Sequence, residues 1–229
     1  MELDIDFVAA LKKVGELGTP EKICALSNDQ IIEYKNKLDY FKLVNGGEYS
    51  NEVKGTALED LVSYLLMISG NIFTVVRNVK THTNEIDQIV ELNAKGKVLY
   101  SYGLLPKRFN HFLGECKNHR RKIDVSYIGK FYSLLLSTAE NTGILFSYYG
   151  ITGRNWSDGN GLIRKIYLQK EDDEKRTAII DFALNDFQRI ADGENFIDII
   201  DNKLKSLKYD TSVDQFISAH PAEGQLLPQ

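Results

Sequence analysis

The chain has 229 residues, of which 43% are hydrophobic and 26% are charged, a balance typical of a folded globular domain. Its formal net charge of −4 argues against nonspecific polyanion binding by the molecule as a whole, although a local basic segment can still contact nucleic acid. No apolar run approaches the roughly 18 residues that span a bilayer, so no membrane association is expected. The N-terminus is acidic and lacks the basic region of a secretory signal. The two cysteines, Cys24 and Cys116, lie in separate segments, which predicts a cytoplasmic protein without a disulfide framework.

Residues 1–50 are predicted to form an N-terminal helical extension. Thr19-Pro20-Glu21 offers a cap followed by proline at the first helical position. Ser27 and Gln30 have the spacing of a capping box. The apolar residues that follow recur at helical spacing, and they are Ile31, Tyr34, Leu38 and Phe41. Asn45-Gly46-Gly47 is expected to end this helix.

Residues 51–208 are predicted to form one α/β domain, and residues 209–229 a loosely ordered tail. A strongly apolar helix is expected first, over residues 53–69. Three strand-like runs follow, at 72–79, 85–92 and 111–116, with a loop between the last two. The remaining elements are a helix at 124–139, a buried strand at 142–150, a glycine-containing loop at 150–161, and amphipathic helices at about 175–191 and about 194–207. This order predicts a central mixed sheet covered by helices on both faces. The first three strands would form an antiparallel meander, and a helix would cross over to the fourth.

Acidic residues interrupt the apolar stretches of this domain at three places. Glu59 lies in the first helix, Asp87 in the second strand and Glu115 at the end of the third strand. Because strand side chains alternate, Glu115 and Lys117 should share one face, while Cys116 points to the other as a small core residue. Antiparallel pairing would bring Asp87 beside Glu115, and the preceding helix could supply Glu59.

Carboxylates gathered in this way repel one another unless a cation lies between them. Oxygen ligands favour Mg²⁺ or Mn²⁺ over zinc, and the backbone carbonyl of Cys116 could add a further oxygen. Lys117 could orient a water molecule and offset negative charge, or could deprotonate the water if its pKa were depressed. The alternative interpretation is a surface ion pair between Glu115 and Lys117 with a solvated Asp87, which leaves the acidic residues within apolar runs unexplained.

These residues resemble the motifs of the PD-(D/E)xK nuclease superfamily. The likeness consists of Glu59, Ile86-Asp87 within NEIDQIVEL, and Glu115-Cys116-Lys117 after a hydrophobic strand, while the next helix and TGILFSYYGITG resemble the Mrr-type restriction endonucleases. The resemblance covers about residues 50–205. It implies a restriction-endonuclease-like fold, a divalent metal on Asp87 and Glu115, a catalytic Lys117 and Glu59 as an auxiliary acid. The sequence departs from the pattern at Ile86, where the superfamily has proline, and at Glu115, where Mrr-like members often have glutamine.

A basic segment follows the third strand directly. Its residues are Asn118, His119, Arg120, Arg121 and Lys122, and they are predicted to contact a phosphate backbone, although a solvated loop before a helix would read in the same way. Five further cations could extend this strip, but the sequence does not show that they share a face. They are Lys54, Arg77, Lys80, Lys107 and Arg108.

The resulting expectation is a Mg²⁺-dependent endodeoxyribonuclease of restriction or antiviral defence that acts on double-stranded DNA. Cutting both strands requires two active sites, so a homodimer or higher homo-oligomer is expected, with the N-terminal helices as candidate contacts. No helix-turn-helix or zinc module is evident, so either loops of the nuclease domain or a defence-system partner would supply specificity. An activating ligand is a further candidate partner. The alternatives are a nuclease of the same fold that cuts RNA or branched DNA, and a non-catalytic nucleic-acid-binding or assembly subunit. The presence of Asp87, Glu115 and Lys117 together argues against the last alternative.

Overall fold

A five-stranded mixed sheet forms the centre of the molecule in this computed structural model, which describes residues 24–80, 85–153 and 158–210. The strands lie in sequence order, and they are β1 (Phe73–Lys80), β2 (Glu85–Leu92), β3 (His111–Lys117), β4 (Thr142–Ser147) and β5 (Ala178–Phe182). The first three pair antiparallel, whereas β3, β4 and β5 are parallel. The predicted α/β class, mixed sheet and antiparallel meander are therefore confirmed.

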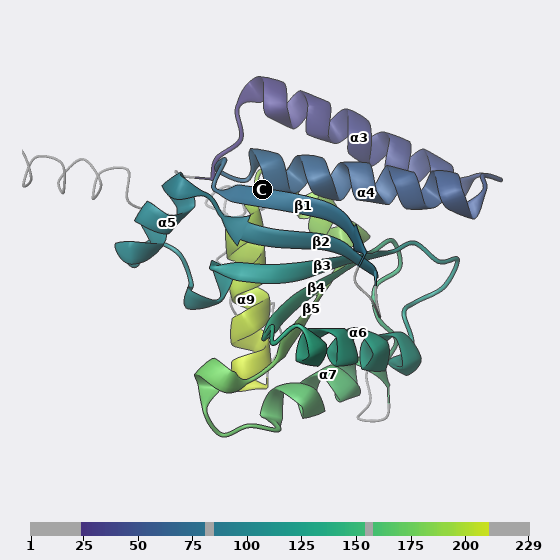
Figure 1. Ribbon diagram of the computed structural model, residues 1–229. Coiled ribbons are helices and arrows are strands. Elements are labelled where there is room, and N and C mark those ends of the chain that lie inside the picture. Colours follow the sequence, from purple (N-terminus) through teal and green to yellow (C-terminus); the bar gives the residue numbers. More distant parts are fainter. Residues whose placement is uncertain (1–23, 81–84, 154–157, 211–229) are drawn as a thin grey trace, which may run out of the picture.

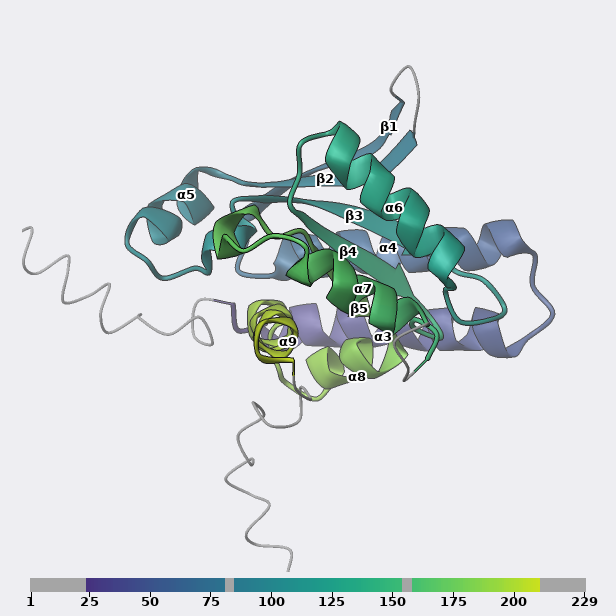
Figure 2. The same cartoon turned by 90° about the horizontal axis from the view of Figure 1, so that it is seen from below.

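Helices cover both faces of the sheet, as predicted (Figures 1 and 2). One face packs against α3 (Asn28–Gly46), α4 (Asn51–Ile68), α8 (Leu184–Ala191) and α9 (Phe196–Tyr209), and the other against α6 (Val125–Ser137) and α7 (Gly159–Leu168). Shorter helices lie in the connections, namely α5 (Ala94–Ser101), η1 (Lys107–Phe109) and η2 (Asp173–Lys175). In the described part of the chain, no helix combines the length and the apolar character that crossing a bilayer requires.

The N-terminal helical extension contributes α3, which begins with the predicted capping box. The Ser27 hydroxyl accepts from the N–H of Gln30, and the Gln30 side chain accepts from the N–H of Ser27. Four buried residues of α3 belong to the same hydrophobic cluster as the sheet, and they are Tyr34, Leu38, Phe41 and Val44. The helix is thus an integral part of the core. The predicted cap at Thr19-Pro20-Glu21 and the tail from Thr211 onward lie outside the described residues.

The connections after β4 differ from the sequence prediction. The prediction of one helix over about residues 175–191 is wrong, because this stretch forms strand β5 and then helix α8. Strand β5 is buried almost throughout, and a parallel strand covered on both faces has a continuous apolar sequence without alternation. Helix α7 begins within the predicted loop 150–161, at Gly159, and α5 lies in the loop predicted between the second and third strands.

Candidate active site

The candidate site lies where β2 and β3 part. Backbone pairing between these strands runs from Glu91 opposite His111 to Gln88 opposite Gly114. In contrast, β3 stays paired with β4 as far as Lys117. Past Gly114, the N–H of Cys116 donates to a carboxylate oxygen of Asp87, 2.8 Å away. The Asp87 side chain therefore takes the place of a backbone acceptor and is fixed beside the end of β3.

Glu115 and Lys117 form an ion pair at this end of β3. The Lys117 Nζ lies 2.7 Å from Oε1 of Glu115, and the two side chains are 29% and 14% exposed, so the pair is partly shielded from water. Glu115 shares the sheet face of Leu113, which packs beneath α6 and α7, because side chains two residues apart point the same way. Cys116 packs against the cluster on the opposite face. The predicted alternation is confirmed.

The charges of this group shift the pKa values of both paired residues. Burial, followed by the negative charge of Asp87, raises the pKa of Glu115 against the lowering effect of Lys117. Burial alone would lower the pKa of Lys117, but the Glu115 carboxylate outweighs it and raises this pKa. A protonated lysine can orient water and offset negative charge, but it cannot accept a proton. The ion pair with Glu115 is thus compatible with the orienting role of Lys117, whereas deprotonation of a water by Lys117 stays a prediction that requires a bound metal.

Buried polar atoms without a hydrogen-bonding partner gather here. In the described part of the chain there are six such side-chain atoms, and four of them belong to Gln88, Glu115, Asn118 and His119. Leaving a buried polar atom unpaired costs about 1–3 kcal/mol, so each position would be stabilised by a bound ion, water or substrate. Glu115, Asn118 and His119 lie at or directly after the end of β3, whereas the Gln88 side chain lies on the opposite face of the sheet, where its amide is 4.0 Å from the sulfur of Cys116.

The oxygen atoms fit the predicted divalent metal in part. Oε2 of Glu115 is shielded and unpartnered among the described residues, and the repulsion between Glu115 and Asp87 is one that a cation would relieve. Asp87 retains one carboxylate oxygen besides the one that accepts from Cys116. Across the described residues, no three His, Cys, Asp or Glu side chains are grouped as a metal site. Two carboxylates supplemented by carbonyl, water and substrate oxygens match the coordination habit of Mg²⁺.

Glu59, the predicted auxiliary acid, contacts a different partner. Its carboxylate accepts a hydrogen bond of 3.2 Å from Arg77 of β1, and Arg77 also lies 3.9 Å from Asp60. The charge of Glu59 still reaches the site, because it contributes, after burial and Asp87, to the raised pKa of Cys116. The structure thus brings Asp87, Glu115 and Lys117 together, whereas Glu59 is paired with Arg77.

The basic segment divides into an anchored part and an exposed part. The Asn118 side chain donates to the backbone carbonyl of Lys54, 2.6 Å away, and the His119 ring lies 4.9 Å from the ring of Tyr127. Arg120, Arg121 and Lys122 are exposed, although Arg121 lies 3.6 Å from Asp124. Of the five residues predicted to contact phosphate, Arg120, Arg121 and Lys122 are therefore exposed, and the half-buried Asn118 and His119 contact the fold.

Most of the additional cations are engaged elsewhere. Lys54 is buried and donates to the Gly47 carbonyl, 3.2 Å away, while Arg77 pairs with Glu59. Lys107 and Arg108 precede β3 and so lie about 20 Å from its other end, given the rise per residue of a strand. The exposed Lys80 ends β1, which runs in the same direction as β3, and so lies at the edge where Lys117 is found. Of the five cations, Lys80 alone fits an extended strip.

One acidic residue beside the site escapes sequence reasoning. Asp181 lies in β5, and its Oδ1 is a further buried atom without a partner among the described residues. Burial raises the pKa of Asp181 to about 6, despite the positive charges of Lys203 and Lys122 and a hydrogen bond from the N–H of Ile151. Asp181 gives the same sequence signal as Asp87, namely an acidic residue within an apolar run. The signal is obscured because the run around Asp181 is predicted to be part of a helix.

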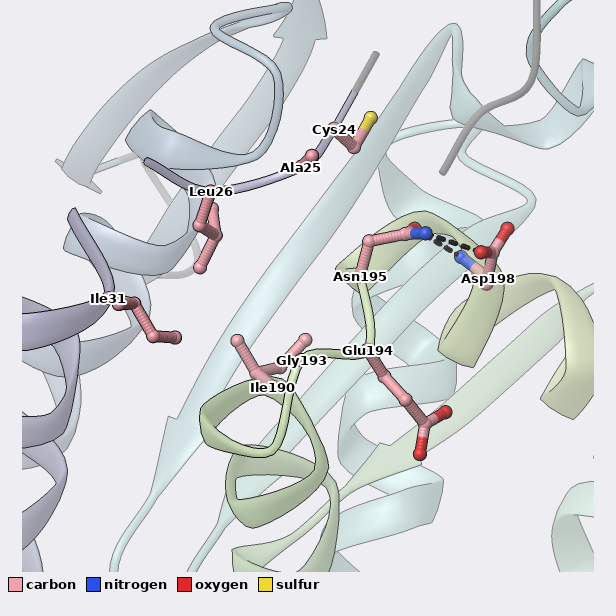
Figure 3. A pocket seen from close by; sticks show the side chains of 9 residues that line it. All are labelled: Cys24, Ala25, Leu26, Ile31, Ile190, Gly193, Glu194, Asn195 and Asp198. Atoms are coloured by element: carbon pink, nitrogen blue, oxygen red, sulfur yellow. Dashed lines mark hydrogen bonds between the residues drawn. The ribbon is translucent and has the colours of Figure 1, made fainter. Parts of the chain in front are cut away.

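A pocket of about 380 Å³ lies between the segment before α3 and the connection from α8 to α9 (Figure 3). Its lining includes Cys24, Leu26 and Ile190, together with Asn195, whose side chain accepts from the N–H of Asp198 at 2.9 Å. Burial raises the pKa of the Cys24 thiol to about 12, so this cysteine is not an activated nucleophile. The pocket contains none of the residues predicted to be catalytic.

Comparison of the chain with protein-family models, with curated proteins and with solved structures gives no match. The interpretation of the site depends on its geometry and on the motif residues themselves.

Proposed function

We propose that the chain is a divalent-metal-dependent endonuclease that hydrolyses DNA phosphodiester bonds, with a restriction-endonuclease-like fold of the PD-(D/E)xK superfamily. The observation that carries this proposal is the convergence of Asp87, Glu115 and Lys117 where β2 and β3 part. The exposed cations of residues 120–122 follow immediately. The order of α4, the three-stranded meander, α6 and β4 supports the proposed fold.

Each residue of the site has a distinct part in the proposed chemistry. Asp87, Glu115 and the carbonyl of Cys116 would hold Mg²⁺ or Mn²⁺. When bound, such an ion supplies Lewis acidity and lowers the pKa of a water molecule. The Lys117 ammonium, held by Glu115, is available to orient the attacking water and to offset negative charge on the phosphate. Arg120, Arg121 and Lys122 would bind neighbouring phosphates.

The biological setting follows from the resemblance. We propose a role in restriction or antiviral defence in the cytoplasm, with double-stranded DNA as substrate and RNA or branched DNA as alternatives for the same site. A homodimer or higher homo-oligomer would provide the two active sites that a double-strand cut requires. A defence-system partner or an activating ligand would control the activity.

A non-catalytic nucleic-acid-binding or assembly subunit is the second candidate. It is favoured by the pairing of Glu59 with Arg77 and by the lack of a three-residue metal group among the described residues. Divalent-metal binding separates the two candidates, because the nuclease should show a thermal shift with Mg²⁺ or Mn²⁺ that Glu115→Ala abolishes. The absence of such a shift in the unaltered protein would favour the binding subunit.

The decisive experiment incubates purified protein with plasmid, linear duplex, single-stranded DNA and RNA, in Mg²⁺ or in EDTA. We expect Mg²⁺-dependent cleavage of duplex DNA, reduced about 100-fold or more by Glu115→Ala or Lys117→Ala, because each removes a group that acts on the reacting phosphate. Glu174→Ala and Lys107→Ala are matched controls, since they disrupt an exposed ion pair that is also 2.7 Å long. Cleavage that survives both site substitutions would rule out the proposed mechanism.

A further inference from the structure

Asp181 belongs to the same row of the sheet as Glu115. Glu115 is the register partner of Leu145 in β4, and Leu145 is the register partner of Asp181 in β5. Register partners point to the same face, and neighbouring strands lie about 4.8 Å apart, so the Cα atoms of Glu115 and Asp181 are about 10 Å apart. The buried Leu145 separates the two carboxyl groups. Asp181 is therefore a neighbour of the candidate site without being one of its ligands.

The loop after β4 is shaped around the Asp181 carboxylate. Its Oδ2 accepts a hydrogen bond of 3.2 Å from the N–H of Ile151. Gly150 has a φ of +71°, and a Cβ atom at this position would lie 3.0 Å from the same oxygen. Any other residue at position 150 would strain the backbone and crowd the carboxylate. The close approach of loop and carboxylate thus depends on glycine.

The same loop holds the basic segment. Ile123 and Ile151 form a parallel β-bridge. The N–H of Ile123 donates to the Gly150 carbonyl at 2.9 Å, and the N–H of Thr152 donates to the Ile123 carbonyl at 2.8 Å. Ile123 directly follows Lys122, the last of the three exposed cations. A continuous path of hydrogen bonds therefore leads from Asp181 to the point where the basic segment rejoins the core.

Charge links Asp181 to this segment as well. The positive charges facing the carboxyl group are those of Lys203 and Lys122, and the facing negative charge is that of Asp186. Lys203 forms an ion pair with Asp186, 2.9 Å away. Of the two cations, Lys122 is therefore the one that belongs to the basic segment and is not paired with Asp186.

We propose that Asp181 is a positioning residue for substrate binding, which fixes the loop at residues 150–152 and through it holds Arg120, Arg121 and Lys122 for phosphate contact. This inference rests on the proposed function. The three cations would bind phosphates and not the reacting atoms, so loss of the Asp181 contact should raise KM and leave kcat nearly unchanged.

Two substitutions at position 181 separate hydrogen bonding from other roles. Asp181→Asn keeps an oxygen that can accept from Ile151, whereas Asp181→Ala does not. With the substrate cleaved by the wild-type chain, we expect Asp181→Ala to raise KM about fivefold or more with kcat within about twofold, and Asp181→Asn to stay within about twofold of wild type in both. Hydrogen–deuterium exchange over residues 118–124 should be faster in the alanine variant and unchanged in the asparagine variant.

A second pair of variants perturbs the contact while Asp181 stays intact. Gly150→Ala should reproduce the raised KM and the faster exchange, because the new Cβ meets the carboxylate. Gly103→Ala is the matched control, since Gly103 has the same φ of +71° but nothing lies within 4 Å of the Cβ position. It tests the effect of backbone strain alone, so this pair of variants remains informative if Asp181→Ala does not fold.

The possible outcomes distinguish this inference from the proposed function. Unchanged KM and unchanged exchange in Asp181→Ala and Gly150→Ala would overturn it, and so would a loss of kcat at constant KM in both variants at position 181. If the wild-type chain cleaves none of the four substrates but the exchange pattern is as expected, the proposed function fails together with the role in substrate binding. Asp181 would then still be shown to order the basic segment, without a role in substrate binding.

Discussion

Three carboxyl groups near the end of β3 are stabilised in different ways. Asp87 accepts from the backbone N–H of Cys116, Glu115 pairs with Lys117, and Asp181 accepts from the backbone N–H of Ile151. Burial raises the pKa of both Glu115 and Asp181. A carboxyl group that is costly to ionise in the folded protein makes stability depend on pH.

The pKa of Asp181 predicts the direction of this dependence. The pKa rises from the ordinary 3.8 to about 6 on folding, so between these values the folded chain keeps a proton that the unfolded chain has lost. The free energy of unfolding should therefore decrease as the pH rises through this window, by up to about 3 kcal/mol. The charges of Lys203, Lys122 and Asp186, which act on this carboxyl group, are present in both the wild-type chain and the Asp181→Asn variant.

Urea denaturation of the wild-type chain and of Asp181→Asn at about pH 4 and about pH 7 measures this effect. We expect the asparagine variant to gain about 1–3 kcal/mol relative to wild type at the higher pH, and most of this gain to disappear at the lower pH. Because the other carboxyl groups are common to both proteins, their titration cancels in the difference. A difference that is the same at both pH values would contradict the assignment.

The residues of the site differ in how far sequence predicts them. Asp87, Glu115 and Lys117 can be grouped because each lies in or at the end of an apolar strand, and strand alternation assigns their faces. Glu59 gives the same signal, but its partner Arg77 lies 18 residues away in another element, and local periodicity does not determine such a pairing. Asp181 requires β5 to be identified first.

At the scale of elements, the antiparallel half of the sheet is easier to predict than the parallel half. Strand β2 alternates buried and more exposed residues, which gives a period of two. Strand β5 is buried at four of its five residues, so it lacks that period, and its apolar run continues into α8. Helix α7 follows a glycine-containing stretch that is typical of a loop. Gly159 is needed there because a Cβ would lie 2.4 Å from the Ile151 side chain.

Helix α6 provides a test of how the basic segment ends. Oδ1 of Asp124 accepts from the N–H groups of Ser126 at 3.0 Å and Tyr127 at 3.4 Å, and so caps the helix directly after the segment. Asp124→Ala should lower the free energy of unfolding by about 1 kcal/mol, and Asp124→Ser, which can still cap, should recover most of the loss. Urea denaturation measures both. Equal stability of the alanine variant and the wild type would show that the cap contributes nothing.

At the scale of the whole molecule, α3 joins the N-terminal segment to the main core and also presents an apolar outer side. Its buried residues pack against the sheet domain, whereas Ile32, Tyr40 and Leu43 are 59%, 50% and 59% exposed. At 100° per residue, these three lie within one side of the helix. Figure 1 shows α3 on the outside of α4. An exposed apolar stripe of this kind is typical of a helix that contacts a partner.

The charges on both sides of the stripe are mixed and paired within the helix. Lys42 lies 3.7 Å from Asp39 on one side, and Lys37 lies 4.0 Å from Glu33 on the other. Because each side carries charges of both signs, neither side presents a block of like charge that would repel the same helix of a second copy. The stripe is the candidate contact for the proposed homodimer.

Sedimentation equilibrium tests this arrangement. We expect a dimer whose dissociation constant rises at least about tenfold in Leu43→Lys, which corresponds to a loss of about 1.4 kcal/mol, because the substitution places a charge in the centre of the stripe. Leu168→Lys is the matched control, since Leu168 is 54% exposed but lies on α7, on the opposite face of the sheet. A wild-type chain that remains monomeric at about 100 µM, or an equal effect of the two substitutions, would exclude α3 as the contact. The two active sites needed for a double-strand cut would then have to come from another interface.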